Sequence, residues 1–276
     1  MKQVLAFDID QTLNELTKTP IPDYMSKLLT ECLEHFEVAL ISGQKFDQFL
    51  VQIVDPMVKN GATPSHLEHL HLFVTQGTQY FRYNNGKTWK KGPVSVTVTS
   101  DKTPYDAKKW ESIYDYPLTK EQVSKIFEVL EKSAKELGFW EEDKLQEGDE
   151  IIEDRHAMVA FSALGQKADA HAKHQWDQDH KKRDQIVARA KELAPEFTFE
   201  VGGTTTINVS TGATKEFGMT HLLKELDVTI DDILYFGDMT QPGGNDYPVV
   251  KMGIDTITVR NCEDTAYALR GILGIL

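Results

Sequence analysis

Apolar runs and amphipathic stretches alternate along the first 75 residues of the chain. Val4-Leu5-Ala6-Phe7 and Val38-Ala39-Leu40-Ile41 are continuous apolar runs, which is typical of strands buried on both faces. Pro22–Phe36 carries its apolar residues on one stripe, and Phe46–Val58 is a second helical segment. A third strand is expected at Leu70–Val74. Strands and helices joined by short links predict an α/β fold built on a doubly wound parallel sheet.

The pattern changes in the middle of the chain. Asn84-Asn85-Gly86 predicts a hairpin turn, because Asn and Gly tolerate positive φ, and Val94–Thr99 alternates like a half-exposed strand. Thr119 begins a helix, and Gln122 completes a capping box. The other elements expected here are the strands Ile151–Glu153, Met158–Leu164 and Phe197–Val201 and the polar helix Gln178–Leu193. They predict an inserted α+β domain.

The first pattern resumes after Thr204. A strand at Thr205–Val209 leads to a helix that starts near Lys215, and buried strands are expected at Ile233–Phe236 and Thr256–Val259. A helix from about Asp264 closes the chain. We therefore expect a core made of residues 1–90 and 203–276, with residues 91–202 inserted as a second domain.

Composition and charge exclude several classes of partner. Among 276 residues, 43 acidic side chains outnumber 30 basic ones, which gives a net charge of −13. Nucleic acids and anionic membranes require clustered Lys and Arg, so neither is an expected partner. No window approaches 18 apolar residues, and the N-terminal segment lacks the features of a signal peptide. The two cysteines, Cys32 and Cys262, form no disulfide framework, and a cytoplasmic location is expected.

Polar residues at strand ends carry the candidate chemistry, because open parallel sheets bind ligands at the carboxyl ends of their strands. Asp8 and Asp10 follow the first strand, two residues apart. Carboxylates this close repel each other unless a cation or a shared proton intervenes. One can act as nucleophile and metal ligand while the other handles protons. An acidic turn in which Thr12 caps a helix is the structural alternative.

Three further strand ends contribute candidates. Ser42 and Gly43 follow the second strand, where a hydroxyl and backbone N–H groups can hold a phosphoryl oxygen. Lys215 stands at the start of a helix, where a cation is mildly unfavourable unless an anion lies nearby. Asp238 and Asp246 flank a Gly- and Pro-containing loop after a strand, a pattern typical of an oxygen site for a hard cation.

The order of these residues resembles a known superfamily. Asp8 and Asp10, then Ser42, Lys215 and the Asp238/Asp246 pair follow the ordered motifs of the haloacid dehalogenase superfamily of phosphotransferases. The loop FGDMTQPGGNDY is similar to that of eukaryotic-type phosphomannomutases. The inserted domain also follows the pattern of that family at Arg155, Met158, Ser162, Gly165 and the pair Gly202-Gly203.

The resemblance implies a role for each core residue. Asp8 would attack phosphorus and form an aspartyl phosphate, and Asp10 would protonate the leaving group and then activate water. Ser42, Gly43 and Lys215 would hold the phosphoryl group. Mg²⁺ would be the cofactor, and its site would be formed by Asp8, by Asp10 through its carbonyl and by Asp238. Asp246 would bind the metal through water or support its direct ligands. The inserted domain would be a cap that closes over the site, and the resemblance leaves a homodimer through this cap open.

The inserted domain departs from the phosphomannomutase pattern. Its second arginine, eleven residues after Arg155, is replaced by Gln166, a cap Asn by Ala160 and a cap Asp by Asn208. Paired arginines grip the distal phosphate of a hexose bisphosphate, and Gln lacks that charge. Arg155, Gln166 and Asn208 are the substrate residues expected in the cap. Gln11 replaces a common Gly, and the segment from Gly92 to about Ile113 has no counterpart.

The first hypothesis is therefore a Mg²⁺-dependent phosphatase that acts on a small phosphorylated metabolite, expected to be a sugar phosphate. The alternative is a phosphomannomutase that uses the same nucleophile with a bound sugar as acceptor. A non-catalytic phosphate receiver on this fold is a third hypothesis, which the complete set of acids and lysine disfavours. Two histidine groups are assigned no role: His66, His69 and His71 in a turn, and His171, His174 and His180 in the insert.

Overall fold

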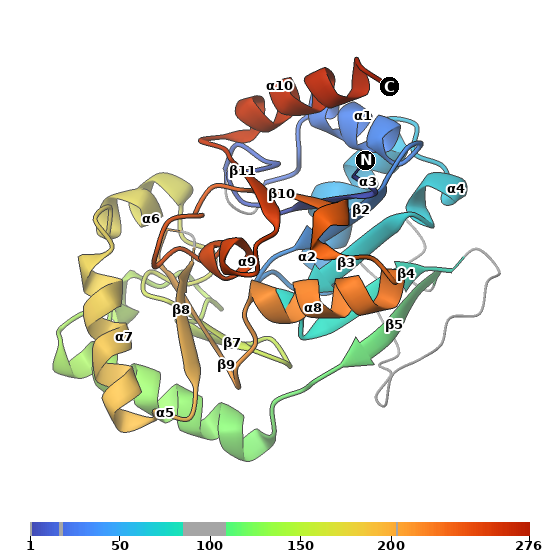
Figure 1. Ribbon diagram of the computed structural model, residues 1–276. Helices are drawn as coiled ribbons and strands as arrows, with labels where there is room; N and C mark the ends of the chain where they lie inside the picture. Colours follow the sequence, from blue (N-terminus) through green and yellow to red (C-terminus); the bar gives the residue numbers. More distant parts are fainter. Residues whose placement is uncertain (1, 17–18, 85–108, 203) are drawn as a thin grey trace. The chain divides into compact units, whose positions relative to one another are not determined.

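The computed structural model describes residues 2–16, 19–84, 109–202 and 204–276. Two compact units are present, Met1–Tyr116 with Thr214–Leu276 and Pro117–Ala213. In the described part of the first unit, seven strands form one sheet in the order β11-β10-β1-β2-β3-β4-β5 (Figure 1). The strands are β1 (Val4–Phe7), β2 (Glu37–Ile41), β3 (Leu70–Val74), β4 (Gln79–Tyr83), β5 (Trp110–Asp115), β10 (Ile233–Gly237) and β11 (Asp255–Thr258).

The sheet is mainly parallel, as the sequence predicts. The five strands from β11 to β3 pair in parallel, and β4 and β5 add an antiparallel edge. Successive side chains of a strand point to opposite faces, so a strand that is apolar throughout serves two cores. In β1, Leu5 and Phe7 belong to one apolar cluster, whereas Val4 and Ala6 belong to another. The predicted α/β fold class is confirmed.

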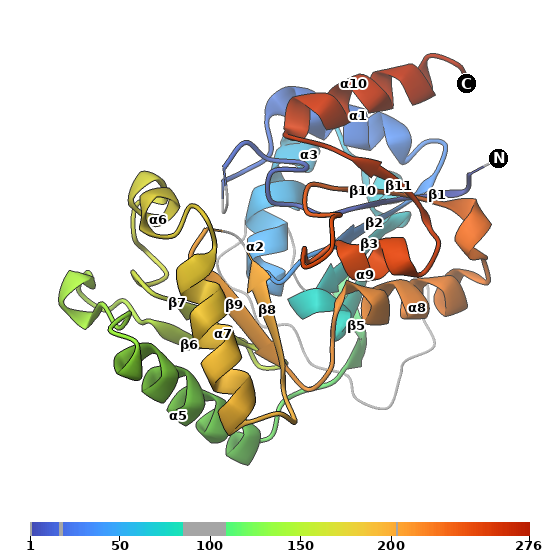
Figure 2. The same cartoon turned by 60° about the vertical axis from the view of Figure 1, so that its left-hand side comes forward.

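Helices cover both faces of this sheet. In Figures 1 and 2, α1 and α10 lie together against one face, and α8 and α9 lie against the other. The predicted helix Phe46–Val58 is one helical run with a π-helical turn (η1) in its middle. The helical segments of this unit are α1 (Asp23–Cys32), α2 (Phe46–Phe49), η1 (Leu50–Val54), α3 (Asp55–Lys59), α4 (Pro64–Leu67), η2 (Thr75–Gly77), α8 (Lys215–Leu226), η5 (Ile230–Asp232), α9 (Tyr247–Lys251) and α10 (Cys262–Leu273).

A pair of glycines brings α8 close to the end of β3. Gly77 has φ +83°, and a Cβ added to it would lie 2.4 Å from Cα of Gly218 on α8. Only a residue without a side chain allows this approach. The contact fixes the first turns of α8, and with them Lys215, beside the carboxyl end of the sheet.

The second unit has its own sheet and core. Four antiparallel strands run in the order β6-β7-β9-β8 among its described residues, and α5 and α7 pack on this sheet (Figure 2). Thr119 caps α5 as the sequence predicts, since its hydroxyl accepts from Gln122 N at 3.2 Å while Gln122 Oε1 accepts from Thr119 N at 2.8 Å. The elements are α5 (Lys120–Glu136), η4 (Glu142–Lys144), β6 (Ile152–Asp154), β7 (Val159–Ser162), α6 (Ala170–Trp176), α7 (Lys181–Leu193), β8 (Thr198–Gly202) and β9 (Thr206–Ser210).

The boundaries of the inserted unit differ from the predicted 91 and 202. β5 pairs with β4 and so belongs to the core sheet, which extends the first segment of the core to Tyr116. The strand expected at Thr205–Val209 lies between β7 and β8, so it belongs to the inserted unit instead of the core. The predicted hairpin turn and the strand Val94–Thr99 lie outside the described residues. Among described helices, none combines the length and the apolar character that crossing a membrane would demand.

Candidate active site

Asp8 and Asp10 lie in the turn that follows β1. Asp8 is buried, and its N–H donates to Phe236 O at 2.9 Å, which continues the pairing of β1 with β10. The chain then turns through Gln11, which has φ +62°, a left-handed conformation that is costly for a residue other than Gly. Asn14 stabilises this turn because its Oδ1 accepts from Gln11 N at 3.1 Å. The two carboxylates therefore stand at the carboxyl end of the central strand.

Lys215 forms ion pairs with two acids that follow different strands. It is fully buried at the start of α8, and its Nζ lies 2.5 Å from Asp8 Oδ1 and 2.6 Å from Asp246 Oδ1. These partners lie 207 and 31 residues away along the chain. The anions explain why a cation occupies a helix N-terminus, which otherwise disfavours positive charge.

Asp246 is the most fully bonded of these acids. Its Oδ1 accepts from Lys215 and also from the Tyr235 hydroxyl at 2.5 Å, and its Oδ2 accepts from Met239 N at 2.9 Å. Three donors leave this carboxylate little capacity to bind a cation directly. These contacts show that Asp246 anchors Lys215, and its expected role at the metal stays a prediction.

Asp8, Asp238 and Asp246 form a compact acidic group, with one carboxylate oxygen of each within 4.8 Å of the others. Burial and the carboxylate of Asp246 raise the pKa of Asp238 to about 7, against the opposing effect of Lys215. Burial also raises the pKa of Asp8 well above its usual value, although Lys215 lowers it. Burial alone would lower the pKa of Lys215, but Asp246 and Asp8 raise it, so it stays charged.

The acidic group fits a divalent cation. Three carboxylates and one ammonium leave two uncompensated negative charges when all are ionised, and oxygen donors suit a hard cation such as Mg²⁺. Burial is the main cause of the raised pKa values of Asp8 and Asp238, and the neighbouring carboxylates add to it. Among the described residues the Asp10 carboxylate is not part of the group, and the expected role of its carbonyl stays a prediction.

The end of β2 supplies the predicted phosphate-binding residues. Ser42 is buried, its N–H donates to Phe73 O at 3.2 Å, and its Oγ accepts from Gln44 N at 3.4 Å. Gly43 follows it in the loop toward α2. Gln44 was not expected to take part, yet its Nε2 donates to Asp10 Oδ1 at 3.0 Å. This contact ties the loop after β2 to the turn after β1.

The inserted unit brings two of its three predicted substrate residues together. Arg155 is buried, its Nε pairs with Glu153 Oε2 at 2.7 Å, and its Nη2 donates to Gln166 Oε1 at 3.2 Å. Asn208 lies on β9, opposite Ala160 of β7. It is buried, and its Oδ1 has no hydrogen-bond partner within the described part of the chain.

A buried cation next to Gln166 was missed by sequence reasoning. Lys173 lies on α6, and its Nζ donates to the backbone carbonyl of Gln166 at 2.9 Å. Burial lowers its pKa, Asp149 raises it and the charge of Arg155 lowers it further. The Asp149 carboxylate also accepts from Gln166 N at 2.8 Å. Arg155, Lys173 and Asp149 thus contact Gln166, and Glu153 pairs with Arg155.

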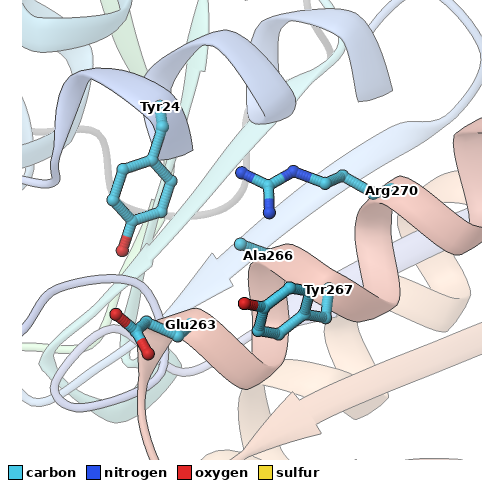
Figure 3. A pocket seen from close by; sticks show the side chains of 5 residues that line it. All are labelled: Tyr24, Glu263, Ala266, Tyr267 and Arg270. Atoms are coloured by element: carbon cyan, nitrogen blue, oxygen red, sulfur yellow. The ribbon is translucent and has the colours of Figure 1, made fainter.

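A surface pocket of about 200 Å³ lies between α1 and α10. Figure 3 shows the side chains that line it, Tyr24, Glu263, Ala266, Tyr267 and Arg270. None of the predicted site residues is among them, so the pocket is distinct from the acidic group at the strand ends.

The chain is similar to several known proteins. Residues 144–275 match the family model for eukaryotic phosphomannomutase. A probable phosphomannomutase of Caenorhabditis elegans is 24% identical over 280 residues, covering 99% of this chain and 96% of the relative. The phosphomannomutase of Schizosaccharomyces pombe is 31% identical over 135 residues, covering 45% of this chain and 50% of the relative. The chain is an enzyme, similar to the phosphomannomutases of the haloacid dehalogenase superfamily.

Solved structures support the fold of this enzyme. An IMP-bound mutant of the IMP-nucleotidase of Plasmodium falciparum superposes with a TM-score of 0.69 at 14% identity, covering all of this chain and 67% of the other. The resemblance to eukaryotic phosphomannomutases that the sequence indicated is confirmed.

Proposed function

We propose that this enzyme is a Mg²⁺-dependent phosphatase of a small phosphorylated metabolite, expected to be a sugar phosphate. Asp8 would accept the phosphoryl group and water would then remove it. One observation favours water over a bound sugar as the acceptor: positive and negative side chains are equal in number around Arg155 and Gln166. The position of Asp8, Lys215 and Asp238 supports the phosphoryl transfer itself.

In the first step, an Asp8 carboxylate oxygen forms a bond to phosphorus while the bond from phosphorus to the leaving oxygen breaks. Asp10 gives its proton to that leaving oxygen. In the second step, water attacks phosphorus, Asp10 takes its proton, and the bond to Asp8 breaks to release inorganic phosphate. Bound Mg²⁺ would offset negative charge on the phosphoryl group and keep Asp8 ionised. Lys215 and Ser42 would hold the phosphoryl oxygens.

The charges of the inserted unit favour water as the acceptor. The resemblance assigns recognition of the distal part of the substrate to this unit. Arg155 and Lys173 supply two positive charges, and Glu153 and Asp149 supply two negative ones, around an uncharged Gln166. A hexose bisphosphate carries a second phosphate dianion, which is best held by a net positive, bidentate partner. A neutral cluster suits a substrate with a single phosphate.

Phosphomannomutase activity is the second candidate. The matching family model and the named relatives support it more directly than they support hydrolysis. It shares the nucleophile, Asp10 and the metal with the first candidate. The difference lies in whether a bound sugar or water takes the phosphoryl group from Asp8.

One assay separates the two candidates. The enzyme receives mannose 1-phosphate, a catalytic amount of hexose bisphosphate and Mg²⁺, and mannose 6-phosphate and free phosphate are followed together. The proposal predicts release of phosphate, with Asp8→Asn as the inactive control. Isomerisation without phosphate release would refute the phosphatase and support the mutase. If Gln166 selects against the bisphosphate, Gln166→Arg raises the ratio of isomerisation to hydrolysis.

Three further expectations belong to this proposal. We propose a cytoplasmic enzyme, which agrees with two buried free thiols, Cys32 and Cys262. The net charge of −13 supports a small phosphorylated substrate in place of a nucleic acid. A homodimer through the inserted unit remains a proposal, which light scattering on a dilution series of the purified protein tests.

A further inference from the structure

We propose that Gln44 is a positioning residue for Asp10. Its Nε2 fixes one oxygen of the Asp10 carboxylate, and its Oε1 accepts a hydrogen bond from the attacking water, whose other proton Asp10 takes. The inference rests on the proposed phosphoryl transfer through Asp8. It concerns a residue that the motifs assign to no role.

The backbone of Gln44 is held rigidly next to the site. Its carbonyl accepts from Thr75 N at 3.0 Å, and its N–H donates to Ser42 Oγ at 3.4 Å. These contacts tie the loop after β2 to the loop after β3. The side chain is 4% exposed, so it has few alternative positions. A group that orients a catalytic carboxylate must itself be immobile.

Two amides hold the same oxygen of Asp10. Gln44 Nε2 lies 3.0 Å and Asn14 Nδ2 lies 3.3 Å from Asp10 Oδ1. Asn14 is fully buried and also donates to Thr19 O at 3.2 Å. The two donors come from different loops, so the carboxylate cannot rotate without breaking both hydrogen bonds. An acid that must reach first a leaving group and then a water benefits from such a fixed plane.

The carbonyl oxygen of the Gln44 side chain, Oε1, indicates a place where a ligand binds. Oε1 is buried and has no hydrogen-bond partner among the residues that the structure describes. Because Nε2 donates to a carboxylate, the amide orientation is fixed and Oε1 is the end left over. A buried acceptor without a partner costs stability unless water or a ligand satisfies it. The group expected at that place is an O–H donor beside Asp10, which describes the attacking water, because water can donate one proton to Oε1 and give the other to Asp10.

A pair of glutamine variants tests this role. Gln44→Met keeps the volume of the side chain and removes both ends of the amide. Gln48→Met is the matched control, because Gln48 lies four residues further on and its Oε1 accepts from Lys45 N at 3.0 Å, outside the site. Rates with Mg²⁺ are measured on p-nitrophenyl phosphate, whose leaving group departs without a proton, and on phenyl phosphate, whose leaving group depends on one.

The expected result is a loss of kcat for Gln44→Met that is at least about tenfold larger on phenyl phosphate than on p-nitrophenyl phosphate. Its Tm should equal or exceed that of the parent, since a buried unsatisfied acceptor is removed. Gln48→Met should lower Tm and leave the ratio of the two rates unchanged. An unchanged ratio for Gln44→Met, or an equal loss on both substrates with a lowered Tm, overturns the inference. A parent enzyme that releases phosphate neither from these esters nor from sugar phosphates instead rejects the proposed function.

Discussion

The metal-free enzyme should become less stable as the pH rises, because of Asp238. Its pKa is about 7 in the folded protein, compared with 3.8 in an unfolded chain. Between these values the folded protein keeps a proton on Asp238 that the unfolded chain has released. The free energy of unfolding therefore falls as the pH rises through this window and levels off above pH 7.

The size of the effect follows from the shift in pKa. Each pH unit over which one proton separates the two states is worth about 1.36 kcal/mol. Between pH 4.5 and 8.5 the raised pKa of Asp238 therefore removes about 3 kcal/mol of stability. Mg²⁺ at about a hundred times its Kd should return about 2.7 kcal/mol at pH 8.5.

Urea unfolding in EDTA at these two pH values measures the loss of stability, with the variant Asp238→Asn as the reference. Asn keeps the shape of the side chain and does not titrate, so the parent should lose about 3 kcal/mol relative to the variant as the pH rises. Mg²⁺ should then stabilise the parent more than the variant. A difference between parent and variant that stays constant within about 1 kcal/mol across this range would refute the reasoning.

Three other changes test the packing and electrostatics. Lys215→Met leaves the buried carboxylates of Asp8 and Asp246 unpaired and should cost about 3–5 kcal/mol in urea unfolding; a loss below about 1 kcal/mol would contradict the ion pairs. Burial lowers the pKa of His71, so stability should fall below about pH 6.5 by up to about 1.4 kcal/mol per pH unit, and His71→Gln should flatten that dependence, unlike the exposed control His35→Gln. Thr119→Ala should cost about 1 kcal/mol in thermal unfolding, whereas Thr119→Ser should not.

Much of the core site could be predicted from the sequence, because the residues follow apolar strands. Strand ends of a parallel sheet meet at one edge, so Asp8 and Asp238 had to lie near each other once their strands were recognised. Lys215 is marked by its unfavourable place at a helix start. No sequence feature indicates that Tyr235 belongs to the site, since a tyrosine inside an apolar strand looks like a core residue. Only the fold shows that its hydroxyl bonds Asp246.

The inserted unit was less predictable. A strand carries no sign of which sheet it will join, so the pattern at Thr205–Val209 fits either unit equally well. Its hydrogen bonds to β7 and β8 show that it belongs to the inserted unit. Lys173 stands in a polar stretch rich in His and Lys, where its burial has no periodic signal. The boundary and this residue both depend on tertiary contacts, which hydrophobic patterning does not encode.

The central position of β1 has a consequence for synthesis of the chain. β1 pairs on one side with β2, which follows it closely, and on the other side with β10, where Val4 lies opposite Ile233. On the ribosome, Val4-Leu5-Ala6-Phe7 must wait until Ile233–Gly237 has been synthesised before that second neighbour emerges. During this interval an apolar strand has one unprotected edge, which is a template for association with other chains. Nascent chains truncated before β10 should therefore be the species that chaperones hold most tightly.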